Sequence, residues 1–424
     1  MNKNYPLRLS NKPLMSLFRE ENNASARDIL KIAFSLFEAE KTIKDGDALD
    51  TIDINLSLMS YSFTEDEKLI QKIESVFLDI LKHNIDLNVY VASNKEYRKS
   101  RKKKTYKKTD TLCLFSGGVD SFFGIFESKK MYKNLQGTFV AHSDQTGTIN
   151  IFNKINETIL KKHKILVKTI NVPSIRPKKN KHGYSQLRGL LYILSCGALL
   201  NIYGGKNIII TECGTTMYQP LFGLYDSITH TTHPLVLRTA NDILSKICNK
   251  KIDFILPYED MTKAEIIASS EYNYYLPKTH SCISSRFRDH CGVCYGCVLR
   301  RLGSILVGVE DANYRHDVFS DEEVDDDNLI SLLRFSYYYI EDKNRLPEYS
   351  LTKTKAYNKW DLFERQSLDV LSALYILKKS NHKFSKRMEK AYNVYVEPIS
   401  KKKLEKRIDI VRRKIKKPNF KKII

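Results

Sequence analysis

The chain has 424 residues, which is enough for two or three compact domains. Lysine and arginine outnumber aspartate and glutamate by 70 to 49, and the formal net charge of +21 suggests a polyanionic partner. The sequence has no run of eighteen apolar residues and no apolar N-terminal segment of signal-peptide length, so we predict no membrane span and a cytoplasmic location. In that compartment, eight cysteines favour thiols or metal ligands over disulfides.

The first 94 residues are predicted to form a small α/β domain. Apolar residues at helical spacing predict two helices, and strict apolar–polar alternation predicts two half-buried strands. In chain order these elements cover 27–41, 51–63, 67–84 and 85–93. Nine of the fourteen residues in 95–108 are basic and lack apolar periodicity, so we interpret 95–109 as an exposed basic linker.

Residues 110–310 are predicted to form an α/β domain with a doubly wound, parallel, five-stranded sheet. Short apolar runs predict the five strands, at 111–115, 137–142, 164–170, 207–211 and 252–256. Helical patterns lie between them, at 122–131, 149–161, 186–202 and 236–247. This alternation is typical of a parallel sheet covered on both faces, which binds its ligands at the carboxyl ends of the strands.

Residues 311–424 are predicted to form a helical C-terminal region with a basic tail. The last 24 residues, 401–424, carry twelve lysines and arginines against two acidic residues. Leu404, Ile408 and Val411 recur at helical spacing, which predicts a helix in the tail. Because charge runs are usually solvated surface, we expect the tail to be dispensable for catalysis, although it could hold a polyanion.

The stretch CLFSGGVDSFF, residues 113–123, joins a predicted strand to a predicted helix. A glycine turn in this place lets backbone N–H groups converge on an anion, and the helix adds its positive end. The hydroxyls of Ser116 and Ser121 can donate to phosphate, whereas Asp120 would either hold Mg²⁺ or cap the helix. An ordinary turn with a serine N-cap explains one serine but not the whole motif, and the Gly-Lys-Ser/Thr ending of a Walker A loop is missing.

The SGGVDS segment resembles the PP-loop of the ATP pyrophosphatases, which split ATP into AMP and pyrophosphate. The resemblance implies a loop that holds the departing pyrophosphate, with Asp120 as a Mg²⁺ ligand. The residues that it assigns to ATP are Phe115, Ser116, Gly117, Gly118, Val119, Asp120 and Ser121.

Four cysteines in the second half of the domain have the spacing C-x8-C-x2-C-x2-C: Cys282, Cys291, Cys294 and Cys297. Gly292 and Gly296 allow a tight knuckle, and four converging thiolates suit a closed, structural zinc site. An iron–sulfur cluster is the main alternative, and a disulfide pair is disfavoured in the cytoplasm. The other four cysteines lie in apolar strands or helices and are predicted to belong to the core.

A PP-loop followed by this cysteine spacing resembles the 7-cyano-7-deazaguanine synthase family, QueC, over roughly residues 110–305. The segment LRGLLYILSCGALLNIYGGKNIIITECG implies that Arg188 lies near the nucleotide, and PYEDMTKAEII implies that Lys263 lies near the phosphates. Taken alone, either cation would be read as surface charge. The family's Tyr-Pro-Asp-Cys-Arg segment, which contacts deazaguanine, is altered here. Tyr218 and Pro220 remain nearby, but the aspartate and arginine do not.

The resemblance implies an ATP-dependent ligase that adenylates a carboxylate, releases pyrophosphate and passes the acyl group to an amine. Its catalytic residues would be Asp120, Ser121, Arg188 and Lys263, its cofactors ATP, Mg²⁺ and Zn²⁺, and its substrate a 7-deazaguanine carboxylate. Enlarged QueC-like proteins of this kind resemble those of anti-phage defence operons, where the acceptor can be a protein amine rather than ammonia. No general base is apparent from the sequence.

Two alternatives remain open. A PP-loop enzyme that modifies tRNA would use the basic segments 95–108 and 401–424 to hold phosphates. A nucleotide-binding scaffold subunit without catalysis would fit the altered substrate segment but not the intact loop.

Overall fold

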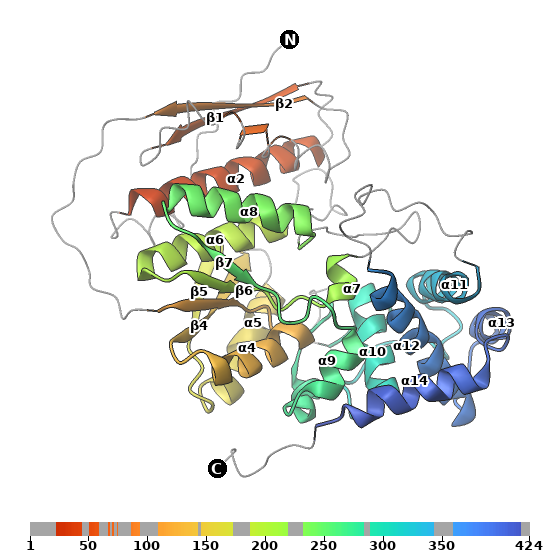
Figure 1. Ribbon diagram of the computed structural model, residues 1–424. Helices are drawn as coiled ribbons and strands as arrows, with labels where there is room; N and C mark the ends of the chain where they lie inside the picture. Colours follow the sequence, from red (N-terminus) through yellow and green to blue (C-terminus); the bar gives the residue numbers. More distant parts are fainter. Residues whose placement is uncertain are drawn as a thin grey trace.

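We describe the fold from a computed structural model (Figure 1). It describes residues 23–44, 51–58, 67, 70, 71, 74, 86–93, 109–142, 146–172, 187–218, 232–283, 289–342 and 359–416. The basic segment 95–108 lies outside these residues, as do 219–231 of the altered substrate segment. In the described part of the chain, no helix is both long and apolar enough to cross a membrane.

The central domain is built on a five-stranded sheet, as predicted. Its strands are β3 (Thr111–Leu114), β4 (Leu135–His142), β5 (Val167–Val172), β6 (Asn207–Ile209) and β7 (Asp253–Ile255). All neighbours pair in parallel, in the order β5-β4-β3-β6-β7. The chain winds from β3 toward β5 and then returns to β6 on the other side of β3. The switch point between β3 and β6 is where a sheet of this type binds its ligand.

Helices cover both faces of this sheet, which confirms the doubly wound architecture (Figure 1). Helices α4 (Val119–Met131) and α5 (Thr146–Ile155, continued by a π-helical turn at Asn156–Leu160) lie on one face, and α6 (Arg188–Tyr203) and α8 (Pro234–Ile247) on the other. The strand predicted at 164–170 begins only at Val167. Lys164 has a positive φ of 54° and ends the preceding turn, so the chain becomes extended later than its apolar pattern suggests.

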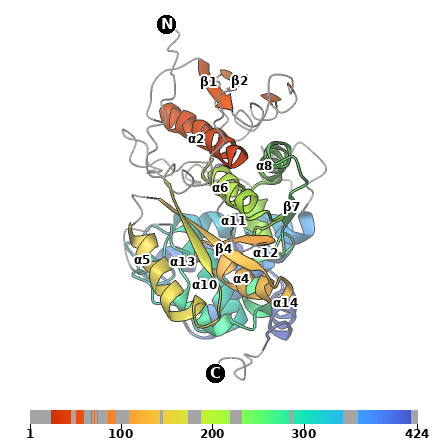
Figure 2. The ribbon, with the colours of Figure 1, turned by 90° about the vertical axis from the view of Figure 1, so that its left-hand side faces the viewer.

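The N-terminal region packs on the central domain through α2 (Ala24–Lys44), which lies against α6. Strands β1 (Thr51–Leu58) and β2 (Asp86–Ser93) form a separate parallel pair, beyond α2 as seen from the main sheet (Figures 1 and 2). Both strands occur where alternation predicts them. Of the predicted helix at 67–84, the structure describes four residues, all helical: Glu67, Ile70, Gln71 and Glu74.

The C-terminal region is helical, as predicted. After β7 come α9 (Lys263–Ser269), a 3-10 helix (Asn273–Lys278), α10 (Tyr295–Val307), α11 (Asp327–Glu341), α12 (Trp360–Lys379), α13 (Lys386–Tyr395) and α14 (Lys401–Arg413). Helix α12 lies against α10, α11 and α14, and α14 also contacts α9. These extra helices therefore pack directly on the elements that follow the sheet.

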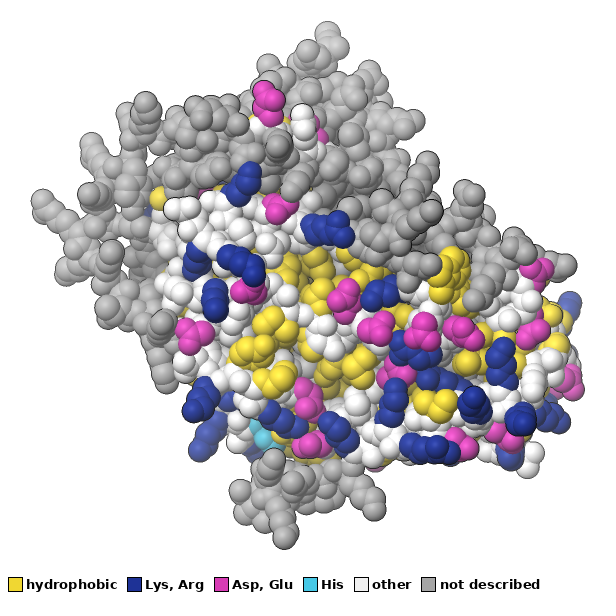
Figure 3. Space-filling model, viewed as in Figure 1, with side chains coloured by type: hydrophobic (Ala, Val, Ile, Leu, Met, Phe, Trp, Pro, Cys, Tyr) yellow, Lys and Arg dark blue, Asp and Glu magenta, His cyan; other side chains and the backbone are white. Residues whose placement is uncertain are grey.

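Most of the described cations of the basic tail are exposed, as expected, but the helix buries its apolar residues and one arginine. Leu404, Ile408 and Val411 are buried at the predicted spacing, and the side chain of Arg407 is only 4% exposed. On the face shown in Figure 3, acidic side chains are interspersed among the basic ones over the C-terminal helices, so this face is not a patch of one sign.

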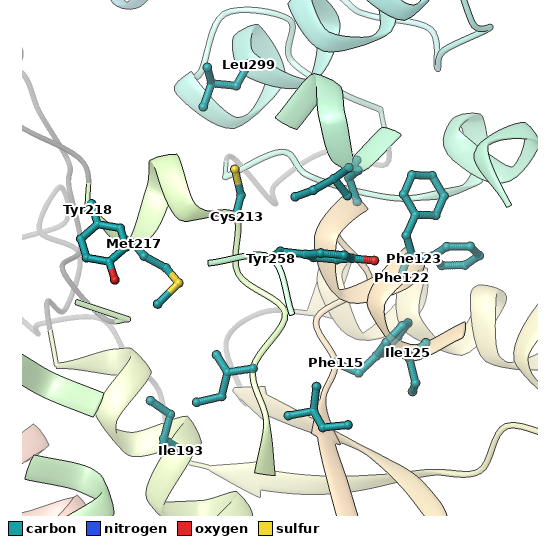
Figure 4. Close-up of a cluster of buried hydrophobic side chains, with 14 of the residues drawn as sticks. Phe115, Phe122, Phe123, Ile125, Ile193, Cys213, Met217, Tyr218, Tyr258 and Leu299 are labelled. Atoms are coloured by element: carbon teal, nitrogen blue, oxygen red, sulfur yellow. The ribbon is translucent and has the colours of Figure 1, made fainter. Parts of the chain in front are cut away.

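The apolar residues on both sides of the SGGVDS segment anchor it in the core. Phe115 directly follows β3 and is 3% exposed, whereas Phe122 and Phe123, in the first turns of α4, are fully buried. Figure 4 shows these rings beside Ile125 in one cluster. Burying bulky side chains immediately before and after the loop fixes the path of the backbone between them, which explains why a polar turn interrupts an apolar run.

Candidate functional site

The SGGVDS loop is a strand–turn–helix in which a glycine begins the helix. Gly117 has a φ of +84°, which only glycine adopts without strain, and Gly118 is the N-cap of α4, with no side chain capping the helix. The serine N-cap considered from the sequence is therefore not what the fold uses. The Oγ atom of Ser121 instead accepts from Ser116 N at 3.1 Å and lies 3.0 Å from Ser116 Oγ, which shapes the loop. Gly118 N donates to Ser116 Oγ at 3.3 Å, so hydroxyls and backbone amides lie together at the positive end of α4, where an anion can bind.

A segment distant in sequence forms hydrogen bonds with the SGGVDS loop. His280 N donates to Gly117 O at 2.8 Å, and Val119 N donates to Ser281 Oγ at 3.3 Å. Both supporting residues directly precede Cys282, the first cysteine of the cluster. The loop is thus tied to the cysteine cluster by backbone and side-chain hydrogen bonds.

Asp120 and Lys263 form a buried ion pair at the mouth of the loop. Lys263 is the first residue of α9, and its Nζ makes a short contact with Asp120 Oδ2; the side chains are 14% and 10% exposed. The same oxygen accepts from Cys213 N at 3.3 Å. Burial alone would lower the pKa of Lys263, but the negative charge of Asp120 outweighs it and raises the pKa. Lys263 is therefore fully charged at neutral pH.

Glu212 is a third charged residue at this point, and the sequence analysis did not single it out. Burial and the nearby charge of Asp120 raise its pKa, Lys263 opposes them, and the net result is a pKa of about 7. The other oxygen of Asp120, Oδ1, is buried without a hydrogen-bond donor among the described residues. A proton or a divalent cation between the two carboxylates would satisfy this oxygen, and Mg²⁺ prefers such ligands. The residues present therefore fit a Mg²⁺ ion.

Arg188 is the first residue of α6 and reaches the same cavity from the other face of the sheet. The residue before it, Leu187, donates its backbone N–H to Glu40 Oε2 at 2.9 Å. Glu40 belongs to α2 and is fully buried. The N-terminal region thus supplies an acceptor at the start of the helix that carries Arg188.

These residues surround one cavity of about 390 Å³, a size that suits a small-molecule ligand. It lies at the switch point between β3 and β6. The loop, Asp120, Glu212, Arg188 and Lys263 line it, together with the rings of Phe115, Phe139, Tyr192 and Tyr295. All the catalytic residues expected from the sequence therefore meet in one place. Of the residues expected at ATP, Phe115, Ser116, Gly118, Val119, Asp120 and Ser121 line the cavity, and Gly117 lies in the turn between them.

The four cysteines also converge. Their sulfur atoms all lie within 4.8 Å of one another, with 3.9 Å between those of Cys291 and Cys297 and 4.0 Å between those of Cys294 and Cys282. Zinc–sulfur bonds of about 2.3 Å in a tetrahedron place the sulfurs about 3.8 Å apart. This geometry fits one metal ion and leaves no room for several iron atoms bridged by sulfide. All eight cysteines are free of disulfides.

The knuckle depends on glycine and on a buried arginine. Gly292 has a φ of +88°, and a Cβ there would lie 2.0 Å from His316 O. Arg300 of α10 is fully buried; it pairs with Asp311, donates to Thr279 O at 2.8 Å and lies 2.9 Å from His290 Nε2. Arg300 thus fixes the segment that joins the cysteine cluster to the loop.

A sequence signal could have identified Glu212, which directly follows the predicted strand at 207–211, where the ligand rule for parallel sheets places functional residues. His280 and Ser281 lie in the THSC segment, and only their contact with the loop and the cavity reveals them.

Residues 140–307 match the family model described as "Queuosine biosynthesis protein QueC". The match covers less than half of the chain and begins after the SGGVDS loop, but it includes Arg188, Glu212, Lys263 and all four cysteines of the cluster. No curated protein matches the chain. The parallel sheet joins the loop to the matched residues through β3 and its neighbours β4 and β6. The central domain is therefore similar to QueC over residues 140–307, and this likeness supports an ATP-using protein of the PP-loop type.

Proposed function

We propose that this protein activates a carboxylate with ATP, forming an acyl-adenylate and releasing pyrophosphate, and passes the acyl group to an amine. A carboxylate reacts poorly with amines because its oxygen is a poor leaving group, whereas AMP leaves readily. The observation that carries the proposal is that a glycine loop at a helix start meets two carboxylates and two cations in one cavity.

In this proposal the loop amides hold the β- and γ-phosphates that leave as pyrophosphate. Asp120 and Glu212 would hold Mg²⁺ through the unpaired Oδ1 atom and the carboxylate beside it. Arg188 and Lys263 would neutralise the charge that develops at the α-phosphate. Catalysis would rest on positioning and charge stabilisation. Bound Mg²⁺ would supply further charge neutralisation at the phosphates.

We propose a 7-deazaguanine carboxylate as the substrate, because the family match extends over the domain that would bind it. The acceptor would be ammonia or an amine of a partner protein. The N-terminal and C-terminal regions outside the match support an enlarged, specialised relative, and we propose a role in anti-phage defence for it.

The test is product analysis with ATP, Mg²⁺, candidate deazaguanine carboxylates and a panel of amines. We expect AMP and pyrophosphate from the wild type and a loss of turnover by orders of magnitude in Asp120→Ala, because that variant loses the metal ligand. Ser121→Ala should be milder, since the amides would still bind the anion. ADP as the product, or undiminished AMP release by Asp120→Ala, would contradict the proposal.

We propose that the cysteine cluster holds one structural Zn²⁺. Such a site can contribute on the order of 10 kcal/mol to folding. Elemental analysis should find about one zinc per chain, and Cys294→Ser should lose both the metal and solubility. Cys248→Ser, at a half-buried cysteine outside the cluster, is the control and should keep the metal. Iron with a visible absorption band would show a cluster instead.

A further inference from the structure

We infer that Asp369 and Arg407 are positioning residues, which act through α9 to hold Lys263 at the loop. Both belong to the C-terminal region, outside the residues that match the family. The inference rests on the proposed function in giving Lys263 its role at the α-phosphate, and it assigns part of that function to the added helices.

The start of α9 is held by a capping box. Thr262 is the N-cap; its Oγ1 accepts from Glu265 N at 3.3 Å, and Glu265 Oε2 accepts from Thr262 N at 3.1 Å. Lys263 follows the cap directly, so the position of its side chain depends on this turn. Thr262 and Glu265 are each 1% exposed.

Two C-terminal helices complete the cap. Thr262 Oγ1 donates to Asp369 Oδ2 of α12 at 2.5 Å. Arg407 of α14 donates from Nε to Asp369 Oδ1 at 2.6 Å and from NH2 to Glu265 Oε1 at 3.2 Å. A closed ring of hydrogen bonds thus runs through Thr262, Asp369, Arg407 and Glu265, next to Lys263.

Further contacts tie the C-terminal region to α9 at both ends. Arg365 of α12 and Lys414 both pair with Glu265, and Lys416 N donates to Ala268 O at 3.0 Å near the end of the helix. The opposing charges of Arg365 and Arg407 hold the pKa of Glu265 below its ordinary value despite burial. Helix α9 has seven residues; its apolar side chains are buried against α10 and α4, and this polar frame fixes its two ends.

The test compares variants on one helix. Arg407→Met removes the cation from the ring, Arg407→Lys keeps a charge there, and Arg413→Met removes an exposed cation from the same helix as a matched control. Thr262→Val removes the threonine hydroxyl from the same ring of hydrogen bonds. It replaces Arg407→Met as the test variant if Arg407→Met does not fold. Melting temperature is recorded for each variant.

The first measurement is the rate at which acetic anhydride modifies Lys263, followed by mass spectrometry without ATP. We expect Lys263 to be protected in the wild type and Arg413→Met, to become several-fold more reactive in Arg407→Met and Thr262→Val, and to be largely protected again in Arg407→Lys. Lys250, which donates to Gly205 O in the central domain, is the internal reference and should not change. Unchanged protection of Lys263 in folded Arg407→Met would overturn the inference.

The second measurement is AMP formation. Arg407→Met should lower kcat by about 100-fold, as expected for misplacing a group at the reacting centre, with a smaller change in the KM for ATP. In a Lys263→Met background the same change should cost little more, because Arg407 acts through Lys263. Additive losses would overturn the inference. If the wild type forms no AMP, the proposed function fails while the labelling experiment still decides the positioning role.

Discussion

Among the described residues that line the cavity, Arg188 and Lys263 are the two with permanent positive charge, and each is contacted by a different end of the chain. Each is the first residue of its helix. Arg188 is placed by α6, whose start is bonded to Glu40 of the N-terminal region. Lys263 is placed by α9, whose start is enclosed by charged residues of α12 and α14.

The difference lies in how much each helix depends on outside support. Helix α6 has sixteen residues, most of them buried against the sheet and α8, and it holds its position largely through apolar packing. Helix α9 has seven residues; its apolar side chains pack on α10 and α4, and charged residues of α12 and α14 bond it at both ends. The start of the shorter helix therefore lies in a polar network, whereas the start of the longer helix receives one hydrogen bond from Glu40.

Replacing each cation by methionine tests this comparison most directly. Lys263→Met should lower AMP formation by about 1,000-fold, because it removes charge at the loop and leaves Asp120 buried beside Glu212 without a cation. Arg188→Met should lower AMP formation by about tenfold. Steady-state kinetics of both variants, with circular dichroism as the control for folding, would measure the difference. Equal losses would show that the two cations contribute alike.

The dependence of AMP formation on pH tests the role of Glu212. Its pKa is raised to about 7, so the carboxylate that would hold Mg²⁺ forms as the pH rises through that value. We expect AMP formation at limiting Mg²⁺ to increase as the pH rises through about 7. The Glu212→Gln variant should not show this increase. Saturating Mg²⁺ should shift this increase to lower pH. A profile unchanged in Glu212→Gln would remove Glu212 from the site.

The free energy of unfolding should also depend on the protonation of Glu212. Because the folded state binds a proton at Glu212 up to about pH 7 and the unfolded state only up to about pH 4.5, the free energy of unfolding should fall as the pH rises between these values. Glu212→Gln should flatten that part of the curve. Urea titrations across this range would measure the slope.

The smallest expected effect is at Glu40. Glu40→Leu leaves the buried N–H of Leu187 without its acceptor and should lower the free energy of unfolding by about 1–3 kcal/mol. Glu40→Gln keeps an acceptor oxygen and is the matched control. Turnover should fall no more than a few-fold in either variant, since α6 is held by its packing. A loss as large as that of Arg407→Met would mean that both helix starts need equal support.

Much of the fold follows from local patterns in the sequence. Alternation predicts β1 and β2, and the five apolar runs predict the strands of the main sheet, because burial on one or both faces acts on neighbouring residues. The boundaries differ where a single turn residue intervenes, as Lys164 does before β5. The SGGVDS turn and the cysteine cluster were predictable for the same reason, since glycine turns and thiolate spacing are local requirements.

The sequence by itself determined the strands, the loop, the cysteine ligands and the expectation that Arg188 and Lys263 share a site. Only the tertiary structure decided that Glu212 lies beside Asp120, that His280 and Ser281 support the loop, and that Arg407 of the basic tail is buried against Glu265. The last contact joins residues 142 positions apart. No local pattern distinguishes a buried lysine or arginine from a solvated one, because the difference lies in whether a carboxylate from a distant element meets it.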